Sequence, residues 1–129
     1  MEKNKFDSWN IRKKTIHEKI EYPHMTEGEV WWCGIGQNVG VEINGKSEFF
    51  SRPIVVYKKL SATSFLGVPL STKKHTGSWY VPFNFLDKQS IAVLSQIRII
   101  SVKRLYRRMG QLDESDFRKI KESFKKLYF

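Results

Sequence analysis

Five short segments rich in Val, Ile, Phe, Trp and Tyr constrain the fold of this chain most, and they are separated by Gly, Asn, Ser and Lys. Branched and aromatic residues favour β-strands, and the small and polar residues between them favour turns. The pattern therefore predicts a small antiparallel sheet or barrel. The predicted strands are residues 30–35, 53–60, 64–70, 78–85 and 91–100.

Residues 5–20 have a different residue pattern, in which apolar side chains recur at spacings near three, four and seven among many lysines. This spacing places the apolar residues on one face of a helix. Pro23 ends the pattern, because proline disfavours helical geometry in the preceding residue. We expect an N-terminal helix docked on the body through Phe6, Trp9, Ile16 and Ile20.

A second helix is predicted at the C-terminus. Asp113 is placed to cap the first free amides, and Leu112 is placed to pack on Phe117 one turn later. The apolar stripe that follows predicts a helix that runs nearly to the last residue. The stripe consists of Phe117, Ile120, Phe124 and Leu127, and the lysines around it are expected to form a solvated face.

The composition limits the chain to one domain with terminal extensions, because 129 residues with 40% hydrophobic content support one core. The formal net charge is +10 at pH 7. Such a charge attracts polyanions, so nucleic acid, an acidic protein or an anionic lipid surface are candidate partners. A charge that serves only solubility is the alternative interpretation.

Several classes of chemistry are disfavoured. Cys33 is the only cysteine, which excludes an intrachain disulfide and a four-thiolate zinc site, and its apolar neighbours predict a buried packing residue. His17, His24 and His75 lack metal-ligand spacing, and no Walker-type glycine motif occurs. No run approaches the roughly 18 apolar residues of a membrane span, so we expect a soluble, cytoplasmic protein.

Arg52 stands directly before Pro53 and a predicted strand, so its guanidinium is expected to project from a restricted backbone. A rigidly placed arginine suits phosphate, because it stays charged and donates several hydrogen bonds in a fixed fork. A surface salt bridge with Glu42 or Glu48 is an equally good interpretation of Arg52 alone.

A hydroxyl pair, Ser71 and Thr72, ends a predicted strand and is followed by Lys73, Lys74 and His75. Hydrogen-bond donors and positive charge at one strand end are suited to bind a phosphate. Adjacent hydroxyls at a strand end are also common turn formers. No nearby Asp-His pair makes Ser71 a hydrolase nucleophile.

Two further polar segments require an explanation. Residues 37–51 are long for a connection between strands, which favours a functional or mobile loop carrying Asn38, Glu42 and Lys46. Ser95, Gln96 and Arg98 interrupt the otherwise apolar segment 91–100, and polar groups placed there need partners or a task.

In order along residues 27–125, five segments resemble the MazF/PemK (Kid-like) toxins of bacterial type II toxin-antitoxin modules. Each match is weak alone, but the ordered set is specific. The segments are Gly28-Glu29-Val30-Trp31-Trp32, Asn38-Val39-Gly40-Val41-Glu42, Arg52-Pro53-Ile54-Val55-Val56, Val68-Pro69-Leu70-Ser71-Thr72 and Ala92-Val93-Leu94-Ser95-Gln96-Ile97-Arg98.

The resemblance implies an SH3-like antiparallel β-barrel with a C-terminal helix over residues 27–129, preceded by a helical extension over residues 1–26. It implies a homodimeric endoribonuclease that cleaves single-stranded RNA, including mRNA, without a metal or other cofactor. Attack by the RNA 2′-OH leaves a 2′,3′-cyclic phosphate and a 5′-OH. The implied protein partner is an acidic antitoxin, with no membrane partner and with DNA reached only through the antitoxin.

The resemblance also assigns roles to residues. Arg52 stabilises the charged transition state, the hydroxyl of Ser71 or Thr72 binds a phosphate oxygen, and Glu42 accepts a proton. A non-catalytic binding module of the same fold and a toxin that acts on a protein target are the competing hypotheses. The expected RNA-binding residues are Asn38, Lys46, Lys73, Lys74, His75, Gln96 and Arg98.

Overall fold

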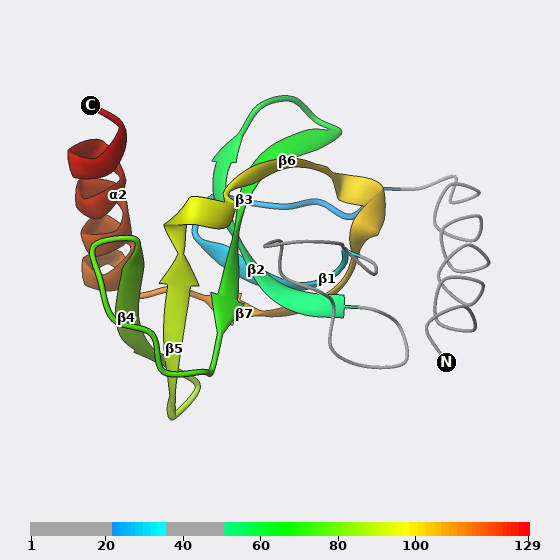
Figure 1. Cartoon of the computed structure of the whole chain (residues 1–129). Helices are drawn as coiled ribbons and strands as arrows, with labels where there is room; N and C mark the ends of the chain where they lie inside the picture. Colours follow the sequence, from blue (N-terminus) through cyan, green and yellow to red (C-terminus); the bar gives the residue numbers. More distant parts are fainter. Residues whose placement is uncertain (1–21, 36–50) are drawn as a thin grey trace, which may run out of the picture.

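A computed structural model describes residues 22–35 and 51–129 of the chain, and these residues form an antiparallel sheet followed by one α-helix (Figure 1). The predicted helix over residues 5–20 and the loop residues Asn38, Glu42 and Lys46 lie outside the described residues. The strands are β1 (Glu29–Gly34), β2 (Ser51–Lys59), β3 (Ser64–Ser71), β4 (Tyr80–Phe85), β5 (Lys88–Val93), β6 (Arg98–Ser101) and β7 (Leu105–Gln111), and the helix is α2 (Glu114–Tyr128).

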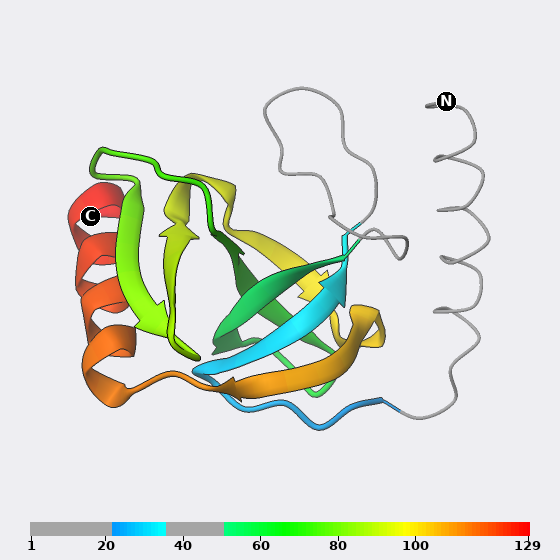
Figure 2. The same cartoon turned by 90° about the horizontal axis from the view of Figure 1, so that it is seen from below.

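The strands pair in the order β4-β5-β3-β2-β1-β7, and every pairing is antiparallel. The sheet curls strongly, and α2 lies beside β4 in both views (Figures 1 and 2). The antiparallel sheet and the C-terminal helix are confirmed. Within the described ranges, strands β4 and β7 stand at the two ends of this pairing order, so closure into a barrel is not confirmed.

The segment 91–100 was predicted as one strand, and this prediction is wrong. The segment lies along one edge of β3, but a 3₁₀ turn, Leu94–Gln96, divides it into β5 and β6. Between the pairs Leu70↔Ala92 and Gly67↔Arg98 the register shifts by three residues, which is the length of this turn. The polar Ser95 and Gln96 therefore stand in a turn rather than inside a buried strand.

Strand β7 was not predicted, because its sequence Leu-Tyr-Arg-Arg-Met-Gly-Gln lacks the apolar texture of the other strands. It pairs with β1 alone among the described strands, and Arg107 and Arg108 are exposed. Charged side chains are common on such edge strands, because they discourage pairing with another chain.

Strand β2 contains a bulge at Tyr57, where its pairing with β3 shifts by one residue between Val56 and Lys58. The Tyr57 ring packs between two aromatic side chains of α2, with ring centroids 6.1 Å from Phe117 and 5.0 Å from Phe124. The helix thus holds the bulge in place.

The core consists of two apolar clusters on the curved sheet. One surrounds Phe65 and includes Cys33, which is fully buried as predicted, and burial raises the pKa of its thiol to about 12. The other includes Leu112 and Ile120 and joins α2 to the sheet. The predicted helix start is confirmed, with Asp113 at the N-cap, although the Asp113 side chain makes no capping hydrogen bond.

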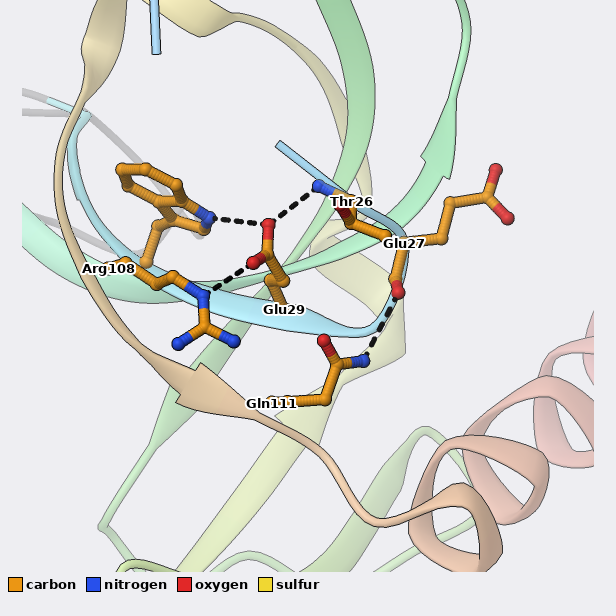
Figure 3. Close-up of polar contacts among 6 residues, drawn as sticks. Thr26, Glu27, Glu29, Arg108 and Gln111 are labelled. Carbon is orange, nitrogen blue, oxygen red and sulfur yellow. Dashed lines mark hydrogen bonds and ion pairs between the residues drawn. The ribbon is translucent and has the colours of Figure 1, made fainter. Parts of the chain in front are cut away.

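The chain enters the sheet through a buried carboxylate, that of Glu29 (Figure 3). Glu29 Oε1 accepts hydrogen bonds from the Thr26 amide at 2.6 Å and from Trp31 Nε1 at 3.3 Å, and Oε2 pairs with Arg108 Nε. Burial alone raises the pKa of Glu29, but the hydrogen bonds and the charge of Arg108 outweigh it, so the pKa lies below its ordinary value.

Candidate functional site

Arg52 lies near the start of β2 and is only 6% exposed. Its Nη1 donates a hydrogen bond to the backbone oxygen of Leu70 at 3.0 Å, which fixes the side chain against β3. Strands β2 and β3 pair at Ile54↔Pro69. Continuing this register by two residues brings Arg52 opposite Ser71, and directly opposed residues of antiparallel strands share a face.

A cavity of about 300 Å³ brings Arg52, Ser71 and Thr72 together. Lys88 and Ser90 of β5 add a cation and a buried hydroxyl to its lining. Four of these five polar residues lie in the neighbouring strands β2, β3 and β5, and Thr72 follows the end of β3. The remaining lining is apolar and consists of Trp32, Pro53, Leu70, Phe85, Leu86 and Met109.

The two hydroxyls differ in their surroundings. Ser71 is 5% exposed, and its Oγ accepts a hydrogen bond from the Lys73 amide at 3.1 Å, which leaves the hydroxyl proton available to a ligand. Thr72 lies just beyond the end of β3 and is exposed.

The basic residues after this pair remain at the surface. Lys73, Lys74 and His75 are exposed and are not among the residues that line the cavity. The His75 ring stacks on Tyr80, with centroids 4.7 Å apart and an interplanar angle of 9°. They border the strand end that carries Ser71 and do not contribute to the cavity wall.

Gln96 and Arg98 are not among the residues that line the Arg52 cavity. With Ile35, Ile54 and Pro69 they line a separate, much smaller hollow. Asn38, Glu42 and Lys46 lie outside the described residues. Of the predicted site residues, the cavity therefore contains Arg52, Ser71 and Thr72.

Sequence reasoning named three of the eleven residues that line the cavity and missed eight, two of which, Pro53 and Leu70, are chain neighbours of Arg52 and Ser71. One signal was available: Trp32 follows Trp31 in a predicted strand, and neighbouring strand residues face opposite sides. Trp31 is buried in the core, so Trp32 faces the other way. The others have no local signal, since they meet only through the strand pairing: Phe85, Leu86, Lys88, Ser90 and Met109.

Leu86 at the cavity edge has unusual backbone geometry. With Asp87 it forms the two-residue turn between β4 and β5, and the two residues have φ angles of 52° and 61°. Positive φ at both positions is typical of type I′ turns, which favour Asn and Gly. A leucine in the left-handed region costs roughly 1–2 kcal/mol.

The cavity is electrically positive at its buried end. Burial lowers the pKa of Arg52 from its usual value, but a guanidinium remains charged at neutral pH. Among residues 22–35 and 51–129, no three His, Cys, Asp or Glu side chains cluster in a way that suits a metal ion. The described part of the chain also has no helix long and apolar enough to cross a membrane.

The sequence of residues 26–128 matches the family model of the PemK-like, MazF-like toxins of type II toxin-antitoxin systems. The chain belongs to this family. The match covers β1 to α2, and thus every strand that lines the cavity. No curated protein matches the chain at a significant level.

Solved structures with the same fold include three from mycobacteria. An endoribonuclease in complex with its cognate antitoxin from a mycobacterial species is 15% identical with a TM-score of 0.63, over 79% of this chain and 92% of that one. The Mycobacterium tuberculosis toxin MazF-mt6 is 17% identical with a TM-score of 0.58, over 78% and 95%. An endoribonuclease from a mycobacterial species is 15% identical with a TM-score of 0.60, over 84% and 93%.

Proposed function

We propose that this family member is a toxin endoribonuclease that cleaves single-stranded RNA, including mRNA, without a metal. One observation carries the proposal: Arg52, Ser71 and Thr72 share one cavity in a chain of net charge +10. Structural relatives that are described as endoribonucleases support it. The residue set is chemically suited to hold one phosphate group, since it offers a fixed cation beside hydroxyl donors.

In the proposed reaction the RNA 2′-OH attacks the adjacent phosphorus and the bond to the 5′-oxygen of the next nucleotide breaks. The products are a 2′,3′-cyclic phosphate and a 5′-OH. Arg52 stabilises the negative charge that builds on the phosphate oxygens, and the hydroxyl of Ser71 or Thr72 donates to one of them. Glu42 remains the proposed acceptor of the 2′-OH proton, and the departing 5′-oxygen takes up a proton from water.

Arg52 acts by electrostatics rather than as a general base. Burial removes water from the guanidinium and strengthens its interaction with a bound phosphate. The bond to Leu70 O fixes the orientation of the guanidinium before the substrate arrives. A positioned cation of this kind loses little free energy to reorganisation during the reaction.

The remaining features of the proposal concern the assembly. Residues 27–129 form the toxin domain as an SH3-like barrel that dimerises, and residues 1–26 form a helical extension. The protein acts in the cytoplasm on RNA, and an acidic antitoxin neutralises it. A structural relative bound to its cognate antitoxin supports this partner. Lys73, Lys74 and His75 are proposed to contact RNA beyond the cavity, together with Asn38, Lys46, Gln96 and Arg98.

The test is cleavage of mixed single-stranded RNA in EDTA by the wild-type protein and by Arg52→Ala. We expect cyclic-phosphate ends with the wild type and a loss of at least about 100-fold with Arg52→Ala, as is typical when a charge-stabilising donor is removed. Arg118→Ala is a matched control, because Arg118 is an exposed arginine of α2 that is not among the cavity-lining residues. RNA left intact by the wild type would favour a binding module or a protein-directed toxin.

A further inference from the structure

Strand β7 has two bulges in its pairing with β1, and their extra residues are Tyr106 and Met109. Met109 lines the Arg52 cavity. The Tyr106 hydroxyl donates a hydrogen bond of 2.6 Å to Oγ of Ser51, the residue directly before Arg52. Bulges occur next to active sites, where they redirect a side chain, and both bulges of β7 direct a side chain to Arg52 or to its neighbour.

Tyr106 reaches Ser51 across the width of β1, which lies between β7 and β2 (Figure 2). Neighbouring strands are about 4.8 Å apart, so the hydrogen bond joins two backbones that are separated by roughly 10 Å. Ser51 pairs with Gly34 of β1, and directly opposed residues share a face of the sheet. Because Gly34 has no side chain, it leaves room for the tyrosine ring to approach the serine.

We propose that Tyr106 is a positioning residue for Arg52. Its hydroxyl holds Ser51 in place, and Ser51 fixes the backbone from which the Arg52 side chain extends. The inference rests on the proposed endoribonuclease function and adds to it a residue that acts through Arg52 without lining the cavity.

The contact is made where β2 has fewer strand partners. Pairing with β3 begins at Ile54, two residues after Arg52, whereas pairing with β1 extends to Ser51. The far end of the Arg52 side chain is fixed by the bond from Nη1 to Leu70 O. Tyr106 fixes the near end, so the guanidinium keeps one orientation toward a phosphate, on which charge stabilisation depends.

Burial makes this hydrogen bond hard to replace by water. Ser51 is fully buried, Tyr106 is half-buried and Arg52 is 6% exposed. A buried hydroxyl that loses its donor must find another partner, and the backbone shifts when it does. Such a shift at Ser51 moves the next residue, which is Arg52.

Two single variants and their combination test the proposal. Tyr106→Phe removes the hydroxyl and keeps the ring, and Ser51→Ala removes the acceptor. Tyr128→Phe is the matched control, because the Tyr128 hydroxyl also donates a hydrogen bond, to Leu94 O at 3.1 Å, and neither residue lines the cavity. Thermal unfolding gives the stability of each variant, and the kinetics are measured well below each Tm.

Cleavage of one defined single-stranded RNA gives kcat and KM separately. We expect Tyr106→Phe and Ser51→Ala each to lower kcat about tenfold and to change KM less than about twofold, because the misplaced group acts mainly in the transition state. The double variant should lose no more than either single variant, since both changes remove the same bond. Tyr128→Phe should keep the wild-type kcat, even if its Tm falls as much.

The position of Arg52 is also followed without cleavage, by the NMR signal of its Nε–H group. Arg52→Lys lacks this group and identifies the signal. We expect the signal to move in Tyr106→Phe and in Ser51→Ala, and to stay in place in Tyr128→Phe.

Three results overturn the positioning role: a kcat of Tyr106→Phe within about twofold of the wild type, losses that multiply in the double variant, or an Arg52 signal that does not move. Cleavage by the wild type with an unmoved signal in Tyr106→Phe refutes only the positioning role. A signal that moves in a protein whose wild type cleaves no RNA refutes only the proposed enzyme.

Discussion

Replacement of Glu29 by glutamine tests whether the buried carboxylate stabilises the point where the chain enters the sheet. Glutamine preserves the shape and keeps one acceptor oxygen for the Thr26 amide and Trp31 Nε1. Its NH₂ group then faces Arg108 Nε, so two donors meet where an ion pair stood. Glu29→Gln therefore removes one charged contact and weakens two others.

The size of the effect follows from these contacts. A hydrogen bond to a charged group contributes about 1.5–3 kcal/mol, against about 1 kcal/mol for a neutral one. The Arg108 side chain is 48% exposed, so water compensates part of its loss, and we assign about 1 kcal/mol to this contact. Two weakened bonds add about 0.5 kcal/mol each. The total of about 2 kcal/mol corresponds to a fall of about 8 °C in Tm.

The effect also has a predicted pH dependence. Because the pKa of Glu29 is lowered in the folded state, its charge stabilises the fold above the unfolded value near 4.5. This stabilisation is lost as the pH falls below 4.5 and through the pKa that Glu29 has in the folded protein. The difference in stability between wild type and Glu29→Gln should therefore be full at pH 7 and shrink below pH 4.5.

Urea unfolding of both proteins from pH 7 to pH 3 provides the measurement. Glu27→Gln is the control, since the Glu27 carboxylate accepts only an exposed hydrogen bond, from the Lys59 amide, among the contacts described. We expect it to change stability by less than about 0.5 kcal/mol. A Glu29→Gln protein as stable as the wild type, or a difference that does not vary with pH, would refute the reasoning.

Three further predictions concern the site and the core. Ser71→Ala should lower the cleavage rate about 100-fold and Thr72→Val much less, because Ser71 is buried opposite Arg52; equal rates for the two would remove this distinction. Gly67→Ala should destabilise the protein by about 2 kcal/mol in urea unfolding, since its Cβ would lie 2.7 Å from Ile100 Cδ1, and added Ile100→Val should restore part of the loss. Cys33 should react with a thiol reagent at pH 8 only after unfolding, because it is buried with a pKa of about 12; rapid labelling of the native protein would contradict its burial.

The sequence predicted the fold where a local pattern was strong. Strands β1 to β4 and helix α2 begin and end within two residues of their predicted positions, because each has a clear apolar pattern between turn residues. Strand β7 was not predicted because its sequence, which contains two arginines, lacks an apolar pattern between turn residues. The turn at Leu94–Gln96 was not predicted because it depends on the pairing of β5 and β6 with β3, a strand that lies more than 20 residues earlier in the sequence.

In the candidate site, too, the sequence predicted the features that a local pattern marks and not those that depend on strand pairing. Arg52 and Ser71 were singled out because a proline and a strand end mark them locally. Their juxtaposition comes from the β2–β3 register, which no local pattern contains. Gln96 and Arg98 were grouped with them by resemblance alone, and the structure places them at a different hollow.

Because β2 has a bulge at Tyr57, an inserted residue has different effects before and after this position. A residue inserted in the turn between β2 and β3 would be absorbed at the hairpin tip, and the pairing beside Arg52 would persist. A residue inserted between Ile54 and Val56 would turn Arg52 to the opposite face, since α2 holds Tyr57 in place. Evolution of this chain is therefore free to vary the hairpin tip, whereas the spacing from Arg52 to Tyr57 is fixed.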